Sequence, residues 1–284
     1  MQIMTKLIFS FLLLSIALFV GCSNSPEETN NHNIGVTLSE ESPKQMLRQA
    51  YQLFKEGKDS QSIAIANRVL EIGRSTKNDT LIGRALTSLC RNSQRTLDTI
   101  RLAELSENLS ILAASSGNKQ WLMYRAHQNA EMWRLVGNLE RAESFYNESM
   151  KISYETGAMG MYTIDHFNKS FVSIAKGDLD TARALIKKYY ALRQEADLAS
   201  QDAYGLIALA YLLEQQEDYE GAHGVAVVTR RLFEEQNVFP EPPDEKPLIR
   251  VEAKVVEELD TDQIAEISNN AKSLKVSDLL SKYL

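Results

Sequence analysis

Few side chains in this 284-residue chain stand at spacings that could support catalysis. Ser173 and Lys176 form the Ser-x-x-Lys spacing of an acylating serine and its lysine, but no companion motif accompanies them. The four histidines form neither an HExxH pattern nor any other close spacing of ligands that a metal ion needs. The sequence also lacks a glycine-rich loop that could cradle a phosphate. We therefore expect a protein that is not an enzyme and that uses neither a cofactor nor a metal.

One of the two cysteines stands in a pattern with a clear chemical meaning. Residues 7–20 form an apolar run that is too short to cross a bilayer core of about 30 Å but suits the hydrophobic region of a signal peptide. The segment Leu18-Phe19-Val20-Gly21-Cys22 resembles a bacterial lipobox, with Phe19 in place of the favoured leucine. The resemblance implies that Cys22 is diacylated and becomes the mature N-terminus after cleavage. A plain secretory signal with a chance cysteine is the alternative.

A lipidated cysteine implies a membrane anchor without a transmembrane helix. Lipid chains on Cys22 would hold the protein at a cell membrane, because each buried methylene contributes about 0.8 kcal/mol. We expect a signal peptide over residues 1–21, and the lipidated cysteine with a polar, flexible tether over residues 22–43. A tether of this kind spans about 25 Å. Ser23 resembles the sorting residue of outer-membrane lipoproteins, which implies an outer-membrane protein facing the periplasm if the source is Gram-negative.

Composition narrows the class of the remaining chain. With 44% hydrophobic and 24% charged residues, the chain has the values of an ordinary globular protein. Only 13 Gly and 6 Pro argue against a turn-rich β-sandwich or barrel. The formal net charge of −7 disfavours nucleic acid as a partner, because binding to phosphates depends on cationic side chains. Two cysteines cannot form a disulfide framework.

An internal repeat with a step of 40 residues organises the chain from residue 44 to residue 237. Turn-like positions, which we call rungs, fall at Gly57, Gly137, Gly177 and Glu217, and Leu97 occupies the place of the missing rung. Small residues recur seven places before each rung, at Ala50, Cys90, Ala130, Ser170 and Ala210. They also recur five places after four of the rungs, at Ser62, Ala142, Ala182 and Ala222. Leu102 breaks the second series, and we expect a local shift that lets Ala103 fill the place.

The spacing of apolar residues between rungs is helical. Each unit is therefore predicted to be two antiparallel helices joined at the rung, where glycine takes a positive φ and Asp or Asn caps the next helix. This pattern of small residue, glycine and alanine resembles the tetratricopeptide repeat (TPR), in its long-helix variety. The resemblance implies an all-α, α-α superhelix: a TPR-like solenoid of about five 40-residue helix pairs. Sister α-solenoids of similar period remain an alternative.

The rungs and the two series of small residues around them form what we call the ladder. Cys90 belongs to the series seven places before the rungs, which favours a buried packing role. Arg91 and Arg95 lie beside it in sequence and keep a reactive thiol open as an alternative, because a reactive cysteine needs an electropositive, partly exposed site.

In TPR folds the first helix of each pair lines a concave groove, which implies a partner-binding surface in this chain. Carried over by the ladder, the groove residues are Tyr51, Phe54, Arg84, Arg91, Tyr124, His127, Glu131, Arg134, Phe167, Phe171, Tyr204, Tyr211 and Glu214. Aromatic side chains and arginine are enriched at protein interfaces. The alternative is that solenoid curvature or the C-terminal segment buries several of these residues.

The chain changes character after the repeats. Four prolines over residues 238–247 predict a linker that is not helical, and residues 248–284 predict C-terminal helices. These helices either cap the last repeat or form a separate docking segment.

The sequence thus favours a membrane-anchored scaffold that binds a protein or peptide partner in the cell envelope. A self-associating structural lipoprotein is the second hypothesis, and a small-ligand receptor or an enzyme supported by the repeats is a third.

Overall fold

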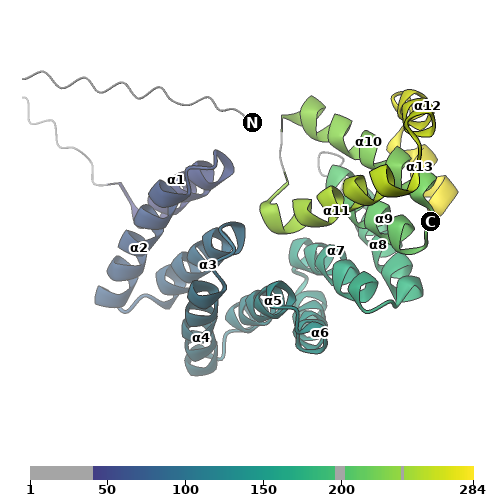
Figure 1. Cartoon of the computed structure of the whole chain (residues 1–284). Helices are drawn as coiled ribbons and strands as arrows, with labels where there is room; N and C mark the ends of the chain where they lie inside the picture. The colour runs from purple at the N-terminus through teal and green to yellow at the C-terminus, as the bar shows by residue number, and fades with distance from the viewer. Residues whose placement is uncertain (1–40, 196–201, 238–239) are drawn as a thin grey trace, which may run out of the picture. The chain divides into compact units, whose positions relative to one another are not determined.

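A computed structural model of the chain describes residues 41–195, 202–237 and 240–284. The predicted signal peptide, the lipidated Cys22 and nearly all of the tether lie outside these ranges. Every regular element in the described residues is a helix, as predicted (Figure 1). The helices are α1 Pro43–Lys55, α2 Asp59–Ser75, α3 Asp79–Arg95, α4 Thr99–Ser116, α5 Lys119–Leu135, α6 Leu139–Thr156, α7 Met159–Ala175, α8 Leu179–Glu195, α9 Asp202–Gln215, α10 Tyr219–Gln236, α11 Pro242–Glu258, α12 Thr261–Ala271 and α13 Val276–Tyr283.

Left-handed backbone conformations mark the joints of the repeat region. All five rungs have a positive φ, including Leu97 at 56° and Glu217 at 62°. The predicted local shift in the second unit is therefore wrong, because Leu97 itself adopts the turn conformation and Ala103 is exposed. In the described residues, the joints that follow the second helix of a pair share this conformation at Lys77, Gly117, Gly157 and Asn237. A joint every 20 residues gives a unit of two helices and a period of 40.

Short polar side chains start the second helix of four of the five pairs. Asp98, Asn138, Asp178 and Asp218 each accept a hydrogen bond from the backbone N–H three residues later, at distances of 2.9 to 3.2 Å. This bond satisfies one of the N–H groups that a helix start leaves without an intrahelical partner. The predicted Asx caps are confirmed in these units.

The ladder of small residues lies at the contacts within helix pairs. The residues seven places before the rungs and those five places after them are all fully buried. Leu102 takes the alanine place in the second pair and is fully buried as well. In the first pair the Ser62 hydroxyl donates a 2.8 Å hydrogen bond to the carbonyl oxygen of Ala50, so the two backbones lie close together. Small side chains thus allow the close approach that the pattern predicts.

The first helices of the pairs form one layer of the solenoid. Contacts join α1 to α3, α3 to α5, α5 to α7 and α7 to α9, in addition to the contacts within each pair. The helices of the unit Glu41–Leu284 follow one another around an arc (Figure 1). The all-α, TPR-like superhelix is confirmed.

The C-terminal segment differs from its prediction at one point. Helix α11 begins at Pro242, whereas the sequence predicts a nonhelical linker as far as residue 247. Pro242 and Pro243 stand at the helix start, where a missing N–H costs nothing, and only Pro247 interrupts the hydrogen-bond ladder. Leu248, Val251 and Val255 of α11 are buried against α9 and α10, and α12 packs on α10. Among the helices of the described residues, none has the length and apolar character of a membrane span.

The positive φ of Leu97 predicts that this rung is strained. A non-glycine residue in the left-handed region costs about 1 to 2 kcal/mol, so Leu97→Gly is expected to raise the free energy of unfolding by about 1 kcal/mol in urea titration. Gly137→Ala should lower it by about the same amount, since Gly137 has a φ of 79°.

Leu97→Ala separates backbone strain from loss of the side chain. It keeps the strained φ and removes a half-exposed side chain, so it should change stability by less than about 0.5 kcal/mol. If Leu97→Gly proves no more stable than Leu97→Ala, the rung carries no strain.

Candidate functional site

Two adjoining cavities lie on the face formed by the first helices of the pairs, and together we call them the groove. The basic end is a cavity of about 390 Å³ built by α1, α3 and α5. The central cavity, about 430 Å³, is built by α3, α5 and α7 with contributions from α8, α9 and the start of α11. Thr87, Arg91 and Tyr124 line both cavities, so they form one continuous surface.

The basic end owes its charge to the register of two helices. Lys44 and Arg48 lie one turn apart on α1, and Arg84 and Arg91 lie two turns apart on α3, so each pair projects from one helix face. Tyr51 is half exposed, and the Arg91 guanidinium lies 5.0 Å from the centre of its ring. The stack of Arg91 on Tyr51 holds the guanidinium in place.

A buried polar network forms the floor of the central cavity. Glu131 is the hub: its carboxylate accepts hydrogen bonds from Asn168 and Arg134, each at 2.7 Å, and from the Tyr146 hydroxyl. Burial opposes the charge on Glu131, but Arg134, His127 and the hydrogen bond from Tyr146 together outweigh burial and lower the pKa of this carboxyl below its usual value. Burial and the Glu131 carboxylate raise the pKa of Tyr146, which stays a donor. The hub is therefore an ionised carboxylate with its acceptors satisfied.

His127 adds a second charged pair to this floor. Its Nδ1 is hydrogen-bonded to Asp165 Oδ1 at 2.7 Å. Burial opposes the charged imidazolium, but Asp165 and Glu131 together outweigh burial, and the pKa of His127 is raised. An imidazole held by a carboxylate is part of many catalytic triads. In the described part of the chain, however, no hydroxyl or thiol is hydrogen-bonded to His127.

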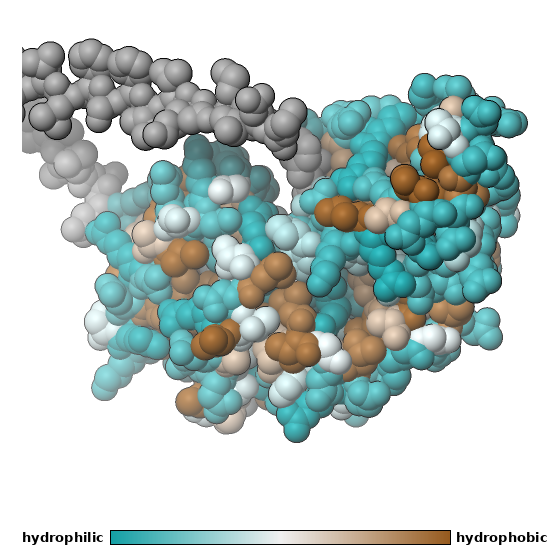
Figure 2. Space-filling model, viewed as in Figure 1, coloured by the Kyte–Doolittle hydropathy of each residue, from teal (hydrophilic) through white to brown (hydrophobic). Residues whose placement is uncertain are grey.

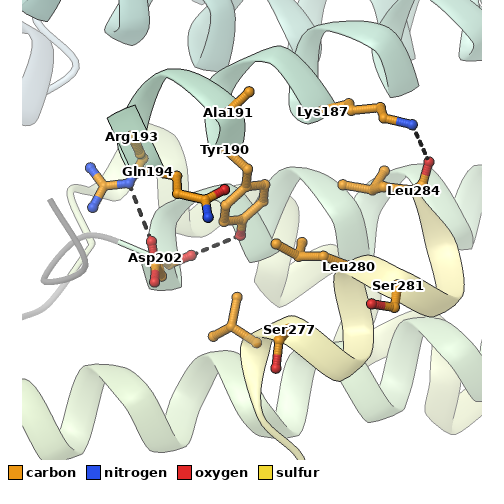
Figure 3. A pocket seen from close by; sticks show the side chains of 11 residues that line it. Lys187, Tyr190, Ala191, Arg193, Gln194, Asp202, Ser277, Leu280, Ser281 and Leu284 are labelled. Carbon is orange, nitrogen blue, oxygen red and sulfur yellow. Dashed lines mark hydrogen bonds and ion pairs between the residues drawn. The ribbon is translucent and has the colours of Figure 1, made fainter. Parts of the chain in front are cut away.

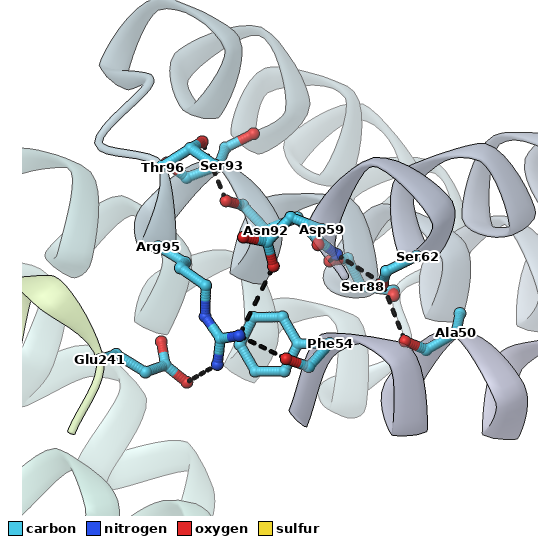
Figure 4. Close-up of polar contacts among 10 residues, drawn as sticks. All are labelled: Ala50, Phe54, Asp59, Ser62, Ser88, Asn92, Ser93, Arg95, Thr96 and Glu241. Atoms are coloured by element: carbon cyan, nitrogen blue, oxygen red, sulfur yellow. Dashed lines mark hydrogen bonds and ion pairs between the residues drawn. The ribbon is translucent and has the colours of Figure 1, made fainter. Parts of the chain in front are cut away.

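The start of α11 forms part of the wall of the central cavity. Glu241, Pro243 and Asp244 line the central cavity. Glu241 lies 3.7 Å from Arg95, which also contacts Asp59 at 3.5 Å and covers the ring of Phe54 (Figure 4). Asp244 lies 3.4 Å from Arg134. The chain thus places two of its own carboxylates against arginines, Arg134 in the central cavity and Arg95 beside it.

These two carboxyl groups are shifted toward their neutral forms. Burial and the neighbouring Asp244 raise the pKa of Glu241 to about 7, against the opposing effect of Arg95. Burial raises the pKa of Asp244 to about 6, against the opposing effect of Arg134. The contact between α11 and the groove is therefore sensitive to pH near neutrality.

The structure brings most of the predicted groove residues to this one surface. Those that line the two cavities are Tyr51, Arg84, Arg91, Tyr124, His127, Glu131, Arg134, Phe167 and Tyr204. Their role in binding a partner stays a prediction.

Four predicted groove residues do not line either cavity. Phe54 is buried under Arg95, and Phe171 is buried beneath Phe167 with the ring centres 4.9 Å apart. Tyr211 and Glu214 are covered by α11, whose Arg250 lies over the Tyr211 ring and 3.3 Å from Glu214. Helix α11 therefore covers these two residues of the fifth unit.

Several residues of the groove were not predicted. Lys44 and Ile164 stand thirteen places before their rungs, as Arg84 and Tyr124 do, so the ladder itself could have found them. Asp165, which lines neither cavity but lies beneath the surface as the partner of His127, carries no periodic signal. Glu241 and Asp244 follow a proline-rich stretch, where nothing in the sequence indicates a return to the groove.

Other candidate centres from the sequence are internally paired or buried. Ser173 is buried, whereas Lys176 contacts Glu143 at 2.6 Å on the surface. Burial raises the pKa of the Cys90 thiol to about 12, which favours the packing role over a reactive thiolate. In the described residues, no cluster of three His, Cys, Asp or Glu side chains could hold a metal ion.

A larger cavity of about 650 Å³ lies elsewhere, between α8, the start of α9 and α13 (Figure 3). Two of its polar side chains are bonded within the chain: the Tyr190 hydroxyl donates to the Asp202 carbonyl oxygen at 2.9 Å, and Lys187 donates to that of Leu284 at 3.1 Å. On the face shown in Figure 2, apolar residues form small patches separated by polar ones, with no large apolar surface among the described residues. The groove, where most of the predicted residues lie together, is therefore the better candidate site.

The raised pKa values predict that acid tightens the contact of α11 with the groove. A carboxyl group whose folded pKa lies above its unfolded value stabilises the contact at low pH and loses that contribution as the pH rises through the folded value. For Asp244, a rise from 3.8 to about 6 corresponds to about 3 kcal/mol between about pH 4 and pH 7. Hydrogen exchange at the amides of residues 244–246 should accelerate over this window.

Glu241→Gln with Asp244→Asn is the matched variant, because the amides copy the neutral acids. Its exchange at the same amides should not depend on pH beyond the intrinsic rate. An equal pH dependence in both proteins would show that these carboxyl groups do not control the contact.

Comparison with known proteins bears on the fold. No protein-family model and no curated protein matches the sequence. Among solved structures, the chain is similar to a thermophilic TPR protein of Thermus thermophilus, with a TM-score of 0.51 and 19% sequence identity. The match covers 76% of this chain and 100% of that protein. The chain is a TPR-like repeat protein in fold.

Proposed function

We propose that this protein is a membrane-anchored scaffold of the cell envelope, which binds a protein or peptide partner in its groove. TPR-like solenoids offer extended concave surfaces for such partners. The observation that carries the proposal is the composition of the groove surface, where tyrosines and arginines, several of them partly exposed, gather on the first helices of the pairs.

The side chains of the groove are better suited to binding a partner than to packing within the protein. Tyrosine and arginine are the side chains that most often dominate binding energy at interfaces, because they combine apolar area with hydrogen-bonding groups. Tyr51, Tyr124 and Arg91 keep part of their surface open to solvent although each already packs on a neighbouring ring or guanidinium. Their low remaining freedom reduces the entropy lost when a partner binds.

The anchoring part of the proposal rests on the lipobox-like segment that ends at Cys22. A lipid anchor and a polar tether would leave the repeat body free to reach a partner near the membrane. In a Gram-negative source, Ser23 favours the outer membrane and a periplasmic location.

The lipid anchor is tested through the two cysteines of the chain. Cys22→Ser should abolish incorporation of labelled palmitate and move the protein from the membrane fraction to the soluble fraction, because the acylated sulfur is lost. Cys90→Ala is the matched control, since Cys90 is buried, and it should leave labelling unchanged. Labelling that survives Cys22→Ser would contradict the anchor.

The groove is tested by site-specific photo-cross-linking in intact membranes. A benzophenone side chain in place of Tyr124 should capture a partner polypeptide, because Tyr124 lines both cavities. The same replacement at Tyr154 is the control: this tyrosine is exposed, lies on α6 and lines neither cavity. Equal capture at both positions, or none at Tyr124, would contradict the groove. Capture of a second copy of the chain would favour a self-associating protein instead.

A further inference from the structure

The basic end of the groove is an unpaired cationic surface in an acidic protein. The described residues of its lining include Lys44, Arg48, Arg84 and Arg91 but no carboxylate. Within the described residues, none of these four side chains takes part in an ion pair or hydrogen bond. The chain as a whole has 38 acidic against 31 basic side chains, so its average composition does not explain four cations without a single acid.

The groove itself indicates what these cations bind. Arg84, Arg91 and Arg95 lie on one face of α3, at intervals of seven and four residues. Arg95, the last of the three, already faces the carboxylates of Asp59 and Glu241 (Figure 4). Arg134 on the next first helix likewise faces Asp244. Arg134 in the central cavity and Arg95 beside it are thus occupied by carboxylates of the chain, whereas Arg84 and Arg91 have no ion pair with any carboxylate of the described residues.

The aromatic side chains of the basic end add a requirement for apolar contact. Tyr51 stacks on Phe54 with ring centres 6.3 Å apart, and Trp121 lies 6.0 Å from Tyr124. Phe54 and Trp121 are buried, but Tyr51 and Tyr124 keep part of their surface open beside the cations, so a ligand that reaches Arg84 and Arg91 also covers apolar surface. Carboxylates beside apolar side chains are what a polypeptide segment provides.

We propose that the basic end binds an acidic segment of a partner polypeptide, whose carboxylates pair with Arg84 and Arg91. The inference rests on the proposed function and specifies the chemistry of its partner. Glu241 and Asp244 set the direction of the segment, because they already face Arg95 and Arg134 at the α11 side and leave less positive charge there for further acidic residues. The acidic part of the partner therefore lies over α1 and α3, and a neutral or apolar part continues toward Ile164 and Phe167.

A pair of synthetic peptides tests this inference on the full chain in nonionic detergent. The probe is a fluorescein-labelled glutamate peptide with one central phenylalanine, and its counterpart carries glutamine in place of glutamate. Fluorescence anisotropy should show binding of the glutamate peptide that is tighter by about tenfold or more and that weakens as salt is added. Equal affinity for both peptides would overturn the inference.

Two double variants locate the binding. Arg84→Glu with Arg91→Glu should weaken binding of the glutamate peptide by at least about tenfold. Arg68→Glu with Arg101→Glu makes the same change in net charge at exposed side chains outside both cavities, and it should have a small effect. Equal losses in the two variants would overturn the assignment to the basic end. Circular dichroism checks folding, and Arg84→Gln with Arg91→Gln replaces the first variant if that protein does not fold.

Two further outcomes separate this inference from the alternatives. An oligothymidine is also tested as a ligand. If it binds more tightly than the glutamate peptide, and if Arg84→Glu with Arg91→Glu abolishes this binding, the inference is overturned in favour of a nucleic acid. If cross-linking at Tyr124 captures a partner and the Arg84 and Arg91 variant captures it equally, the scaffold function stands and the acidic segment is wrong.

Discussion

The close approach of two helices within each pair is the interaction on which the rest of the structure depends. It requires a small or fully buried side chain at two fixed places in each unit, and a joint that reverses the chain within two or three residues. Both requirements recur every 40 residues, so the pairs stack with the same face inward. The groove follows from this stacking, because each first helix presents the same positions to the same space.

This dependence explains which features the sequence could predict. The ladder of glycines and small residues predicted the helix pairs, their caps and most of the groove lining, since each of these repeats with the period of the backbone. Leu97 shows the limit of residue types as a guide: its position in the ladder determines a left-handed conformation that leucine itself disfavours. The place of this residue in the repeat predicted the turn correctly, whereas its residue type argued against a turn.

Features that depend on contacts between distant parts of the chain were not predictable in this way. The return of α11 to the groove joins residues that are about a hundred positions apart, as in the pair of Arg134 and Asp244. It also covers Tyr211 and Glu214, which by their place in the ladder should have been exposed. Proline composition predicted a break before residue 248, yet prolines at a helix start are compatible with a helix. Local sequence cannot distinguish these cases, because the difference lies in what the segment contacts.

The return of α11 also changes the mechanics of the solenoid. In a linear repeat array each unit touches only its neighbours, so one end can fray or flex without the other. Here α11 packs on α9 and α10 while its first turn pairs with Arg95 of the second unit and Arg134 of the third. These ion pairs connect α11 to the middle of the solenoid. They oppose changes in the pitch of the superhelix, and they couple unfolding of the last units to unfolding of the middle ones.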